Sequence, residues 1–361
     1  MTILFVCIII GLCTNSQHCT IVQLTKKLMD SYANPRLIAK ICKQYFEDGL
    51  TQQEIADTLR ISRSTVSRIL SKARDERIIR ISIEVPAGLF PELERALERK
   101  FDLVEAVVVE TFNYGSPFGV ARELGEVAAS YLERTIRPHD IIGFAWGTTM
   151  KSLVDNLRSK TVPDVQVVQL NGGLTPHMTD LHATALTRDM AARLGGECYI
   201  LQAPGVVDDP HTQQMFMADP QVAQVFELAA QANLAFIGIG NISAESLWGR
   251  AGLLTEEVTS ELKSLGAVGD VMSRYFDEDG ILVNSSLCRR VVGLPIEKLR
   301  PIPRRVGVAG GKNKFEAILA ALRGKYVNIL ITDHLTAQKL VDSSNGASTD
   351  PSIESAESDR R

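Results

Sequence analysis

LTQQEIADTLRISRSTVSRILSKARDERIIR, residues 50–80, is the stretch that decides the fold of the first part of this chain. Thr51 and Glu54 have the spacing of a capping box, and Ser62 is placed as the N-cap of a second helix. Apolar pairs at staple positions support both helix starts: Leu50 with Ile55, and Ile61 with Val66. The segment therefore predicts two helices joined by a turn at residues 60–62, which is a helix-turn-helix.

A third helix is expected before these two. Asn34 is placed as its N-cap with Pro35 at the first helical position, and Gly49 is a stop signal. Apolar side chains recur at helical spacing on all three segments and predict one small shared core. The expected core residues are Leu37, Ile38, Ile41, Tyr45, Phe46, Ile55, Ala56, Leu59, Val66, Ile69, Leu70 and Ala73.

The outer side of the last helix is polar and mostly basic. Residues 62–80 carry six Lys or Arg against two acidic residues, in a chain whose formal net charge is −4. Such a local basic surface is the electrostatic footprint of nucleic-acid binding, and a solvated face on an ordinary helical hairpin is the alternative. The start of the second helix reads base edges in this motif. We therefore expect base contacts from Arg63, Ser64, Ser67 and Arg68, and phosphate contacts from Lys72 and Arg74.

Length and composition indicate a second, larger domain. The chain has 361 residues, of which 45% are hydrophobic, enough for a sizeable core. The negative net charge excludes a nonspecific polycation, so DNA binding is expected to be local and to need an oligomer. The six cysteines form no CxxC pair and show no metal-ligand spacing with the six histidines. No metal or other cofactor is therefore expected, and a reduced, cytoplasmic setting is the simplest account.

The two ends of the chain differ from the rest. Residues 4–12, LFVCIIIGL, form an apolar run that is too short to span a bilayer and lacks a preceding positive charge. We expect residues 1–33 to be an extension, with translation beginning at Met29 as the favoured reading, and no membrane association. Residues 343–361 are almost without apolar side chains and are expected to form a disordered tail.

Between the ends, apolar runs alternate with amphipathic stretches. The expected strands are Val104–Val109, Ile141–Trp146, Val165–Leu170, Tyr199–Ala203, Leu234–Ile239, Arg305–Ala309 and Val327–Thr332. The expected helices include Val120–Arg134, Asp180–Leu194, Pro220–Ala232 and Lys314–Leu322. This alternation predicts a doubly wound α/β sheet that binds ligands at the carboxyl ends of its strands. The expected domains are a helix-turn-helix at 34–80, a linker at 81–102 holding a strand and a Pro91-initiated helix, and an α/β domain at 103–342.

Two glycine turns after strands have residues suited to an anion. Gly147-Thr148-Thr149 offers two hydroxyls and the free N–H groups of a helix start. Residues 309–314, AGGKNK, form a second junction of this kind, and their spacing does not fit a nucleotide-binding Walker A loop. Lys314 at a helix start opposes the helix dipole unless an anion lies nearby. Ordinary turn chemistry is the alternative at both places.

Three further segments complete the candidate ligand site. Asn171-Gly172-Gly173 follows an expected strand, and turn chemistry explains it equally well. Asp270 is expected in the first turn of a helix that runs to Phe276, either as a favourable dipole partner or as an acceptor for sugar hydroxyls. Arg250 lies beside Trp248 in an expected loop, where the tryptophan either covers a sugar or packs on the surface.

Together these motifs resemble the SorC-type (SorC/DeoR) sugar-binding transcriptional regulators over residues 35–342. The helix-turn-helix is followed in order by GFAWGTTM, VVQLNGG, FIGIGN, GAVGDVMSRYFDEDG and AGGKNKFEAILAALRGKYVNILITD. The resemblance implies an effector domain similar to ribose-5-phosphate isomerase and glucosamine-6-phosphate deaminase, in which a phosphosugar binds without turnover. It also implies homotetramers on operator DNA that regulate a carbohydrate catabolic operon.

The same resemblance implies roles for individual residues. Gly147, Thr148 and Thr149 would cradle phosphate, Asp270 would contact sugar hydroxyls, and Lys314 would pair with the effector anion. Some members carry Arg where this chain has Asn171, which disfavours a bisphosphorylated effector. A monophosphate, or an unphosphorylated sugar or polyol, is therefore expected.

The alternative function is that of a sugar-phosphate isomerase or deaminase with a DNA-binding appendage. Such an enzyme needs a poised base and a proton relay within reach of the sugar. Asp270 and Glu316 are the candidate acids, and His177 or His182 the candidate relay. No histidine-containing constellation is visible in the sequence, so we expect a regulator and no enzyme.

Overall fold

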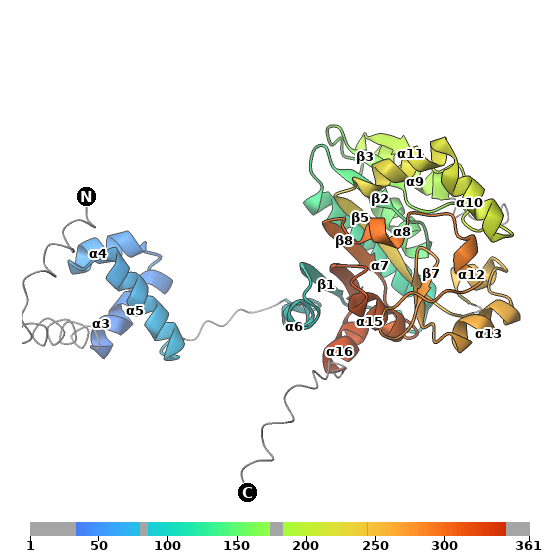
Figure 1. The fold of residues 1–361 in the computed structure, drawn as a ribbon. Coiled ribbons are helices and arrows are strands. Elements are labelled where there is room, and N and C mark those ends of the chain that lie inside the picture. Colours follow the sequence, from blue (N-terminus) through green and yellow to red (C-terminus); the bar gives the residue numbers. More distant parts are fainter. Residues whose placement is uncertain (1–33, 80–85, 174–182, 244, 344–361) are drawn as a thin grey trace, which may run out of the picture. The chain divides into compact units, whose positions relative to one another are not determined.

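The computed structural model describes residues 34–79, 86–173, 183–243 and 245–343. The chain divides into two compact units with the boundary after Glu84, and each has its own hydrophobic core. Figure 1 shows the helical unit in blue and the α/β unit in the remaining colours. The expected extension, tail and linking strand lie outside the described residues.

Local capping fixes the helices of the first unit, as the sequence predicted. Thr51 and Glu54 form the reciprocal capping box, with the Thr51 N–H donating to the Glu54 carboxylate at 2.8 Å. Arg60 ends the second helix in the left-handed conformation, and the Ser62 hydroxyl accepts from the Thr65 N–H to start the third. The helices are α3 (Pro35–Phe46), α4 (Gln52–Leu59) and α5 (Arg63–Asp75).

The core of this unit follows the predicted apolar positions with one exception. Ile41, Ile55 and Val66 are fully buried at its centre. Phe46 was expected inside but is 41% exposed, because it lies at the last residue of α3, where its ring packs edge-on against Tyr45. Cys42, on the same face of α3 as Ile38, is buried there instead.

The second unit is built on a nine-stranded sheet whose main path runs β1-β9-β8-β5-β2-β3-β4. All neighbours along that path are parallel, while β6 and β7 form an antiparallel hairpin on the end of β5. The strands are β1 (Glu105–Val109), β2 (Ile141–Phe144), β3 (Gln166–Gln169), β4 (Glu197–Tyr199), β5 (Leu234–Asn241), β6 (Gly269–Val271), β7 (Arg274–Phe276), β8 (Arg304–Val308) and β9 (Ile329–Asp333).

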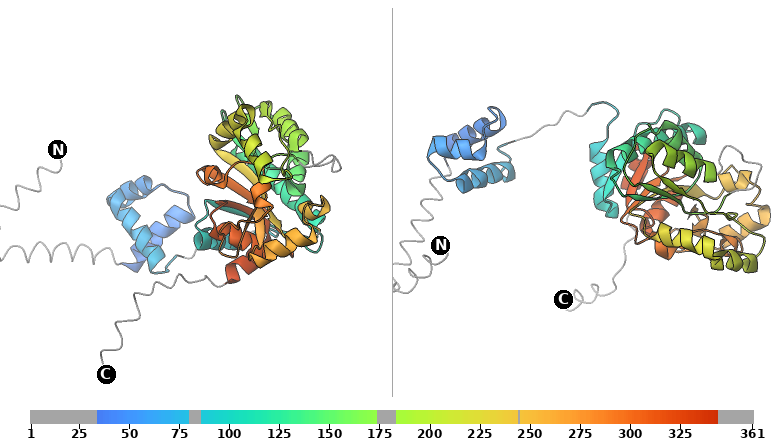
Figure 2. Two further views of the ribbon diagram at one scale, coloured as in Figure 1. Left: turned by 45° about the vertical axis from the view of Figure 1, so that its right-hand side comes forward. Right: turned by 90° about the horizontal axis from the view of Figure 1, so that it is seen from above.

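Helices cover both faces of this sheet (Figures 1 and 2). One face packs against α7 (Pro117–Thr135), α8 (Thr148–Asn156) and α9 (Ala183–Leu194). The other packs against α6 (Pro91–Phe101), α11 (Pro220–Ala230), α15 (Phe315–Arg323) and α16 (His334–Asp342). Shorter or peripheral helices are α10 (Pro210–Ala218), α12 (Leu247–Arg250), α13 (Glu256–Ser264), η3 (Cys288–Arg290) and α14 (Ile296–Leu299).

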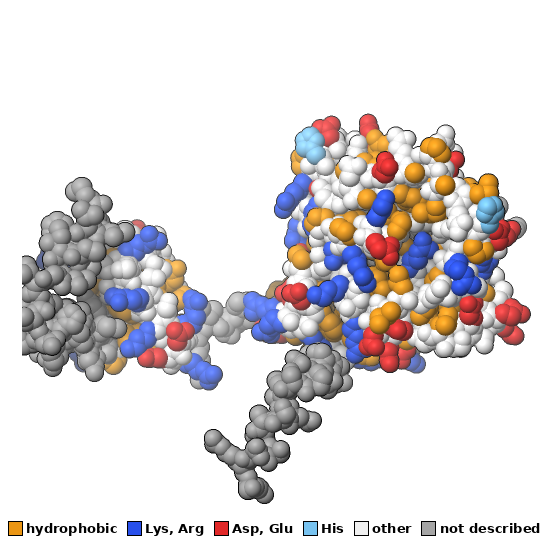
Figure 3. All heavy atoms as spheres, in the orientation of Figure 1, with side chains coloured by type: hydrophobic (Ala, Val, Ile, Leu, Met, Phe, Trp, Pro, Cys, Tyr) orange, Lys and Arg blue, Asp and Glu red, His pale blue; other side chains and the backbone are white. Residues whose placement is uncertain are grey.

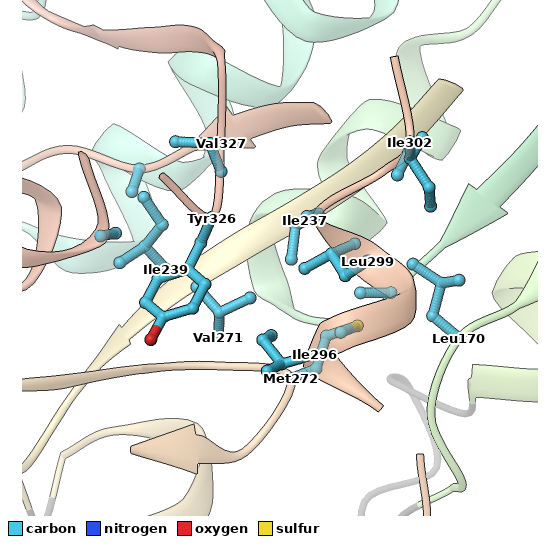
Figure 4. Close-up of a cluster of buried hydrophobic side chains, with 14 of the residues drawn as sticks. Leu170, Ile237, Ile239, Val271, Met272, Ile296, Leu299, Ile302, Tyr326 and Val327 are labelled. Carbon is cyan, nitrogen blue, oxygen red and sulfur yellow. The ribbon is translucent and has the colours of Figure 1, made fainter. Parts of the chain in front are cut away.

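The two-sided burial explains why the strands read as continuous apolar runs. Along β5, Leu234 and Phe236 enter the core on one face, and Ala235 and Ile237 enter the core on the other. Figure 4 shows the second of these cores, where Ile237 lies among side chains from the β6–β7 hairpin and α14. The hairpin is therefore anchored in the domain core.

The strand order places a topological switch point between β2 and β5. From β2 the chain winds outward through β3 and β4, then returns to β5 on the opposite side of β2 and continues to β8 and β9. Loops at the carboxyl ends of β2 and β5 consequently diverge, and a crevice forms between them. The combination of a helix-turn-helix with a doubly wound α/β domain is the predicted fold class.

Three expectations about the second unit were wrong in detail. β4 ends where a strand was expected to begin, because Gly195 terminates α9 at a positive φ and the strand follows directly. The segment around Asp270 is a β-hairpin rather than a helix, because Val271 is buried by pairing with Ile239 of β5. The helix expected in the linker, α6, packs against β1 and α16 and belongs to the α/β unit.

Candidate functional site

The exposed side of α5 carries all six residues that were predicted to contact DNA. Thr65, Val66, Ile69, Leu70 and Ala73 are buried and fix how this helix sits on its core. Arg63, Ser64, Ser67, Arg68, Lys72 and Arg74 are all exposed. Lys and Arg side chains are visible on the surface of the helical unit in Figure 3.

The two arginines at the start of α5 are the strongest candidates for reading bases. Arg63 lies at the first position of the helix and Arg68 one and a half turns later, and neither has an acidic partner within the described residues. A free guanidinium can donate two parallel hydrogen bonds to guanine. Ser64 is partly committed, because its hydroxyl lies 2.8 Å from that of Ser62, and Lys72 lies 3.6 Å from Glu76.

A cavity of about 590 Å³ lies at the carboxyl edge of the large sheet, at the switch point. Its size fits the range of small-molecule sites. Residues that follow β2, β5 and β8 line it, together with the β6–β7 turn and the starts of α7 and α12. It brings together most of the residues predicted to bind an effector: Gly147, Thr148, Thr149, Asn171, Arg250, Asp270 and Lys314.

Gly172 and Gly173 were also predicted to contact the effector, but they do not line this cavity. A Cβ on Gly172 would lie 2.3 Å from the Pro204 carbonyl oxygen, so this glycine permits two backbones to approach closely. Its own carbonyl accepts a 2.8 Å hydrogen bond from the Trp146 indole N–H. Gly173 forms a bridge with the same Pro204 segment. Both glycines therefore support the cavity wall.

The turn after β2 presents free donors to the cavity. Gly147 is the N-cap of α8 and supplies no side-chain acceptor, so the first N–H groups of the helix lack a side-chain cap. The positive end of the helix dipole lies at the same place. With the Thr148 and Thr149 hydroxyls beside them, these N–H groups form a site suited to an anion.

The buried carboxylate of Asp333 stabilises the second glycine turn, at residues 309–314. Asp333 accepts from the Gly311 N–H at 2.7 Å and from the Thr336 N–H and hydroxyl at 2.8 and 2.7 Å. A Cβ on Gly310 would lie 2.3 Å from the Asp333 oxygen, so glycine is required there. The turn is thus fixed just before Lys314, which occupies the N-cap position of α15 without a side-chain capping bond.

Lys314 and Asp270 are the two oppositely charged groups at the floor of the cavity. The Lys314 ammonium donates to the Ile239 carbonyl at 2.8 Å, while the Asp270 carboxylate accepts from the Ser273 N–H at 3.0 Å. Burial lowers the pKa of Lys314 to about 8 and raises the pKa of Asp270 to about 6, and the charge of each opposes the shift of the other. Both groups are therefore largely charged near neutral pH.

Asp270 keeps one oxygen without a partner. The residue is 4% exposed, and Oδ1 makes no hydrogen bond of ordinary geometry within the described structure, although the Trp248 side chain is close enough to lower the pKa of this carboxyl. Strand pairing sets Asp270 opposite Gly240, whose missing side chain makes room, because a Cβ there would lie 1.8 Å from Oδ1. A buried carboxylate oxygen without a donor is costly, so a ligand hydroxyl is a natural partner for it.

Aromatic side chains form the remaining walls. The Trp146 and Trp248 rings lie 5.3 Å apart, and Trp248 sits in α12 at 7% exposure rather than in a surface loop. The Arg250 guanidinium lies 5.1 Å from the centre of the Phe118 ring. Sequence reasoning missed Phe118 and Ser273 as cavity residues. Neither belongs to a glycine turn, which was the signal that identified the others.

Of the residues considered for catalysis, Asp270 lines the cavity and Glu316 does not. Glu316 is exposed on α15, while His177 and His182 lie outside the described residues. Over the described ranges, no three His, Cys, Asp or Glu side chains group as metal ligands would. No helix in those ranges has the length and apolar character needed to cross a membrane.

Comparison with known proteins covers both units. Residues 87–342 match the family described as "Putative sugar-binding domain", and residues 39–76 match "Sigma-70, region 4". The chain is 35% identical over 309 residues to the "Deoxyribonucleoside regulator" of Bacillus subtilis (strain 168), spanning 85% of this chain and 97% of that protein. It is 32% identical over 320 residues to the "Sorbitol operon regulator" of Klebsiella pneumoniae, spanning 87% and 100%.

The crystal structure of the full-length sorbitol operon regulator SorC from Klebsiella pneumoniae is similar to this chain. It superposes with a TM-score of 0.65 at 32% identity, covering 85% of this chain and 99% of that one. The similarity therefore extends across the helix-turn-helix and the α/β domain together.

Proposed function

This chain belongs to the SorC-type family of sugar-binding transcriptional regulators, and we propose from that premise that it controls a carbohydrate catabolic operon. It binds operator DNA through α5, and a sugar or sugar phosphate in the cavity changes its affinity for that DNA. The observation that carries this proposal is the presence, in one chain, of an exposed basic helix face and a charged cavity at the switch point.

Base recognition falls to the first turns of α5. Arg63 and Arg68 donate to base edges, with Ser64 and Ser67 beside them, and Lys72 neutralises phosphate. A single unit of this size buries too little surface for tight specific binding. The protein therefore acts as a homo-oligomer, a tetramer in the proposal, in which paired units read two half-sites.

The ligand is held at two ends. An anionic group, phosphate in the preferred version, lies on the Gly147-Thr148-Thr149 turn, and the Lys314 ammonium in the same cavity attracts it. The hydroxylated part of the ligand lies against Asp270 Oδ1, the unpartnered buried acceptor. Asn171 supplies no charge, so a monophosphate or an unphosphorylated polyol suits the cavity better than a bisphosphate.

Ligand binding alters DNA affinity by favouring one arrangement of the oligomer. A coupling of about 1–3 kcal/mol is typical of such linkage between two sites. The proposed function places the protein in the cytoplasm with the DNA. The relatives named above are regulators, and the protein is proposed to bind its ligand without converting it.

The test begins with selection of bound sequences from random DNA by the full-length protein. Affinity for the selected sequence is then measured with ribose 5-phosphate, glucose 6-phosphate, fructose 6-phosphate or glucitol 6-phosphate added, and each sugar phosphate is followed by NMR for turnover. We expect specific binding, a shift with at least one compound and unchanged ligand. Binding that is independent of sequence would refute the regulator function, and steady conversion of a sugar phosphate would favour the enzyme.

A further inference from the structure

The turn between β6 and β7 has an unusual conformation for its sequence. Val271 pairs with Arg274, so Met272 and Ser273 alone form the turn, and their φ angles are +49° and +63°. A two-residue hairpin turn with both residues at positive φ is of type I′, which normally contains Asn and Gly. Neither Met nor Ser is favoured there, because the left-handed conformation brings their Cβ atoms too close to the backbone.

Packing compensates for Met272 but not for Ser273. Met272 is 6% exposed and lies in the hydrophobic core with Val271 and Ile296, as Figure 4 shows. Ser273 is 1% exposed, lines the cavity, and its hydroxyl has no hydrogen-bond partner within the described structure. Glycine would adopt the same turn without strain and without a buried orphan hydroxyl. The serine therefore destabilises the fold, and no contact of its hydroxyl within the described residues compensates.

Two other buried oxygens on the cavity wall are also unpartnered. They are Oδ1 of Asp270 and Oδ1 of Asn171, whose side chains are 4% and 3% exposed. All three oxygens can accept a hydrogen bond, and the Ser273 hydroxyl and the Asn171 amide nitrogen can also donate. The Lys314 ammonium lies beside the Asp270 strand, because it donates to Ile239, and its charge acts on the Asp270 carboxylate. These three unpartnered oxygens on the cavity wall therefore suit neutral hydroxyl donors of a ligand.

We propose that Ser273 is a specificity-determining residue that, with Asp270 and Asn171, recognises adjacent hydroxyl groups of the ligand. This inference rests on the proposed function and names the ligand class: a sugar or polyol phosphate with hydroxyls retained on the carbons remote from the phosphate. A deoxy analogue leaves a buried oxygen unpaired and binds less well. The strained turn serves this role because it directs the Ser273 hydroxyl into the cavity, where the ligand can form a hydrogen bond with it.

The test uses the full-length protein and follows binding by calorimetry. The probes are ribose 5-phosphate, 2-deoxyribose 5-phosphate, glucitol 6-phosphate and inorganic phosphate. The variants are Ser273→Ala, which removes the hydroxyl, and Ser273→Gly, which removes it and relieves the turn. Ser285→Ala is the matched control, because Ser285 is fully buried, lies outside the cavity, and its hydroxyl accepts from the Cys288 N–H.

We expect both Ser273 variants to bind the best hydroxylated probe about tenfold more weakly, the effect of losing one buried hydrogen bond. Inorganic phosphate should bind them as it binds the parent, because the anion end is unchanged. Ser273→Gly should melt at the same or a higher temperature than the parent, which separates ligand recognition from a structural role. Ser285→Ala should melt lower and bind every probe like the parent.

The outcomes distinguish this inference from the function on which it rests. Parent-like affinity of both Ser273 variants for a bound sugar phosphate would overturn the role of Ser273 and leave the effector site standing. Tighter binding of 2-deoxyribose 5-phosphate than of ribose 5-phosphate would overturn the hydroxyl requirement. If no sugar phosphate binds the parent while inorganic phosphate does, the inference is wrong and only an anion site remains. If no probe binds at all, the proposed effector site fails with it.

Discussion

Asp270→Asn is expected to make the α/β domain more stable while it weakens ligand binding. The parent side chain is 4% exposed and leaves Oδ1 unpartnered against Gly240. Asparagine has nearly the same shape, and its oxygen can still accept from the Ser273 N–H. The substitution therefore removes a buried negative charge without opening a void.

The size of the effect follows from the pKa of Asp270. Burial raises this pKa from 3.8 to about 6, so between these values the folded protein binds more protons than the unfolded chain. Parental stability therefore falls as the pH rises from about 4 to about 6. Above pH 6 the charged carboxylate costs about 3 kcal/mol relative to a neutral group. This value is the upper end of the expected gain, because losing the carboxylate also lowers the pKa of Lys314 further.

Urea unfolding monitored by tryptophan fluorescence isolates the relevant domain. The chain has two tryptophans, Trp146 and Trp248, and both lie in the α/β unit beside the cavity. We expect Asp270→Asn to be more stable than the parent by up to about 3 kcal/mol at pH 7.5, and the two proteins to converge near pH 4. The same fluorescence should report weaker binding of ribose 5-phosphate or glucitol 6-phosphate by the variant.

The pH profile of the stability difference tests whether the buried charge of Asp270 destabilises the domain. If the difference in unfolding free energy between Asp270→Asn and the parent stays constant from pH 4 to pH 7.5, burial does not destabilise the charged carboxylate. A variant less stable than the parent at pH 7.5 would show that the charge of Asp270 stabilises the domain, which is the opposite of the expected sign.

Three further predictions concern DNA and anion binding. Arg63→Ala and Arg68→Ala should each weaken binding to the selected operator by about 1–3 kcal/mol and relax sequence specificity, whereas Lys72→Ala should weaken binding to all sequences alike and flatten its salt dependence. A gel-shift titration measures this, and equal losses of affinity for operator and random DNA in both arginine variants would contradict the assignment. A fragment of residues 30–90 should bind operator far more weakly than the full chain, because the α/β domain is proposed to assemble the paired units, and equal affinity in fluorescence anisotropy would rule that out. Phosphate binding should weaken as the pH rises above about 8, where Lys314 loses its charge. Lys314→Met should abolish this pH dependence while operator binding persists. If calorimetry gives the same pH dependence of phosphate affinity for the parent and the variant, Lys314 is not part of the anion site.

The sequence by itself determined the elements whose causes are local. The capping box of Thr51 and Glu54, the Ser62 cap and the turn at Arg60 each depend on residues within a few positions of one another. The same holds for the exposed basic face of α5, because helical periodicity alone assigns its buried side. Apolar runs with glycine turns likewise predicted the parallel sheet and the loops at its carboxyl edge, and with them Thr148 and Lys314.

The tertiary structure alone decided which side chains meet in the cavity and in what state. Asp270 belongs to a strand because its segment pairs with β5, and the space at Gly240 for its carboxylate comes from that pairing. Gly172 supports the wall because Pro204 packs on it, and Ser273 faces the cavity because a left-handed turn holds it there. These contacts join residues distant in sequence, so register and packing fix them. Local sequence propensity predicts neither the strand register nor the packing.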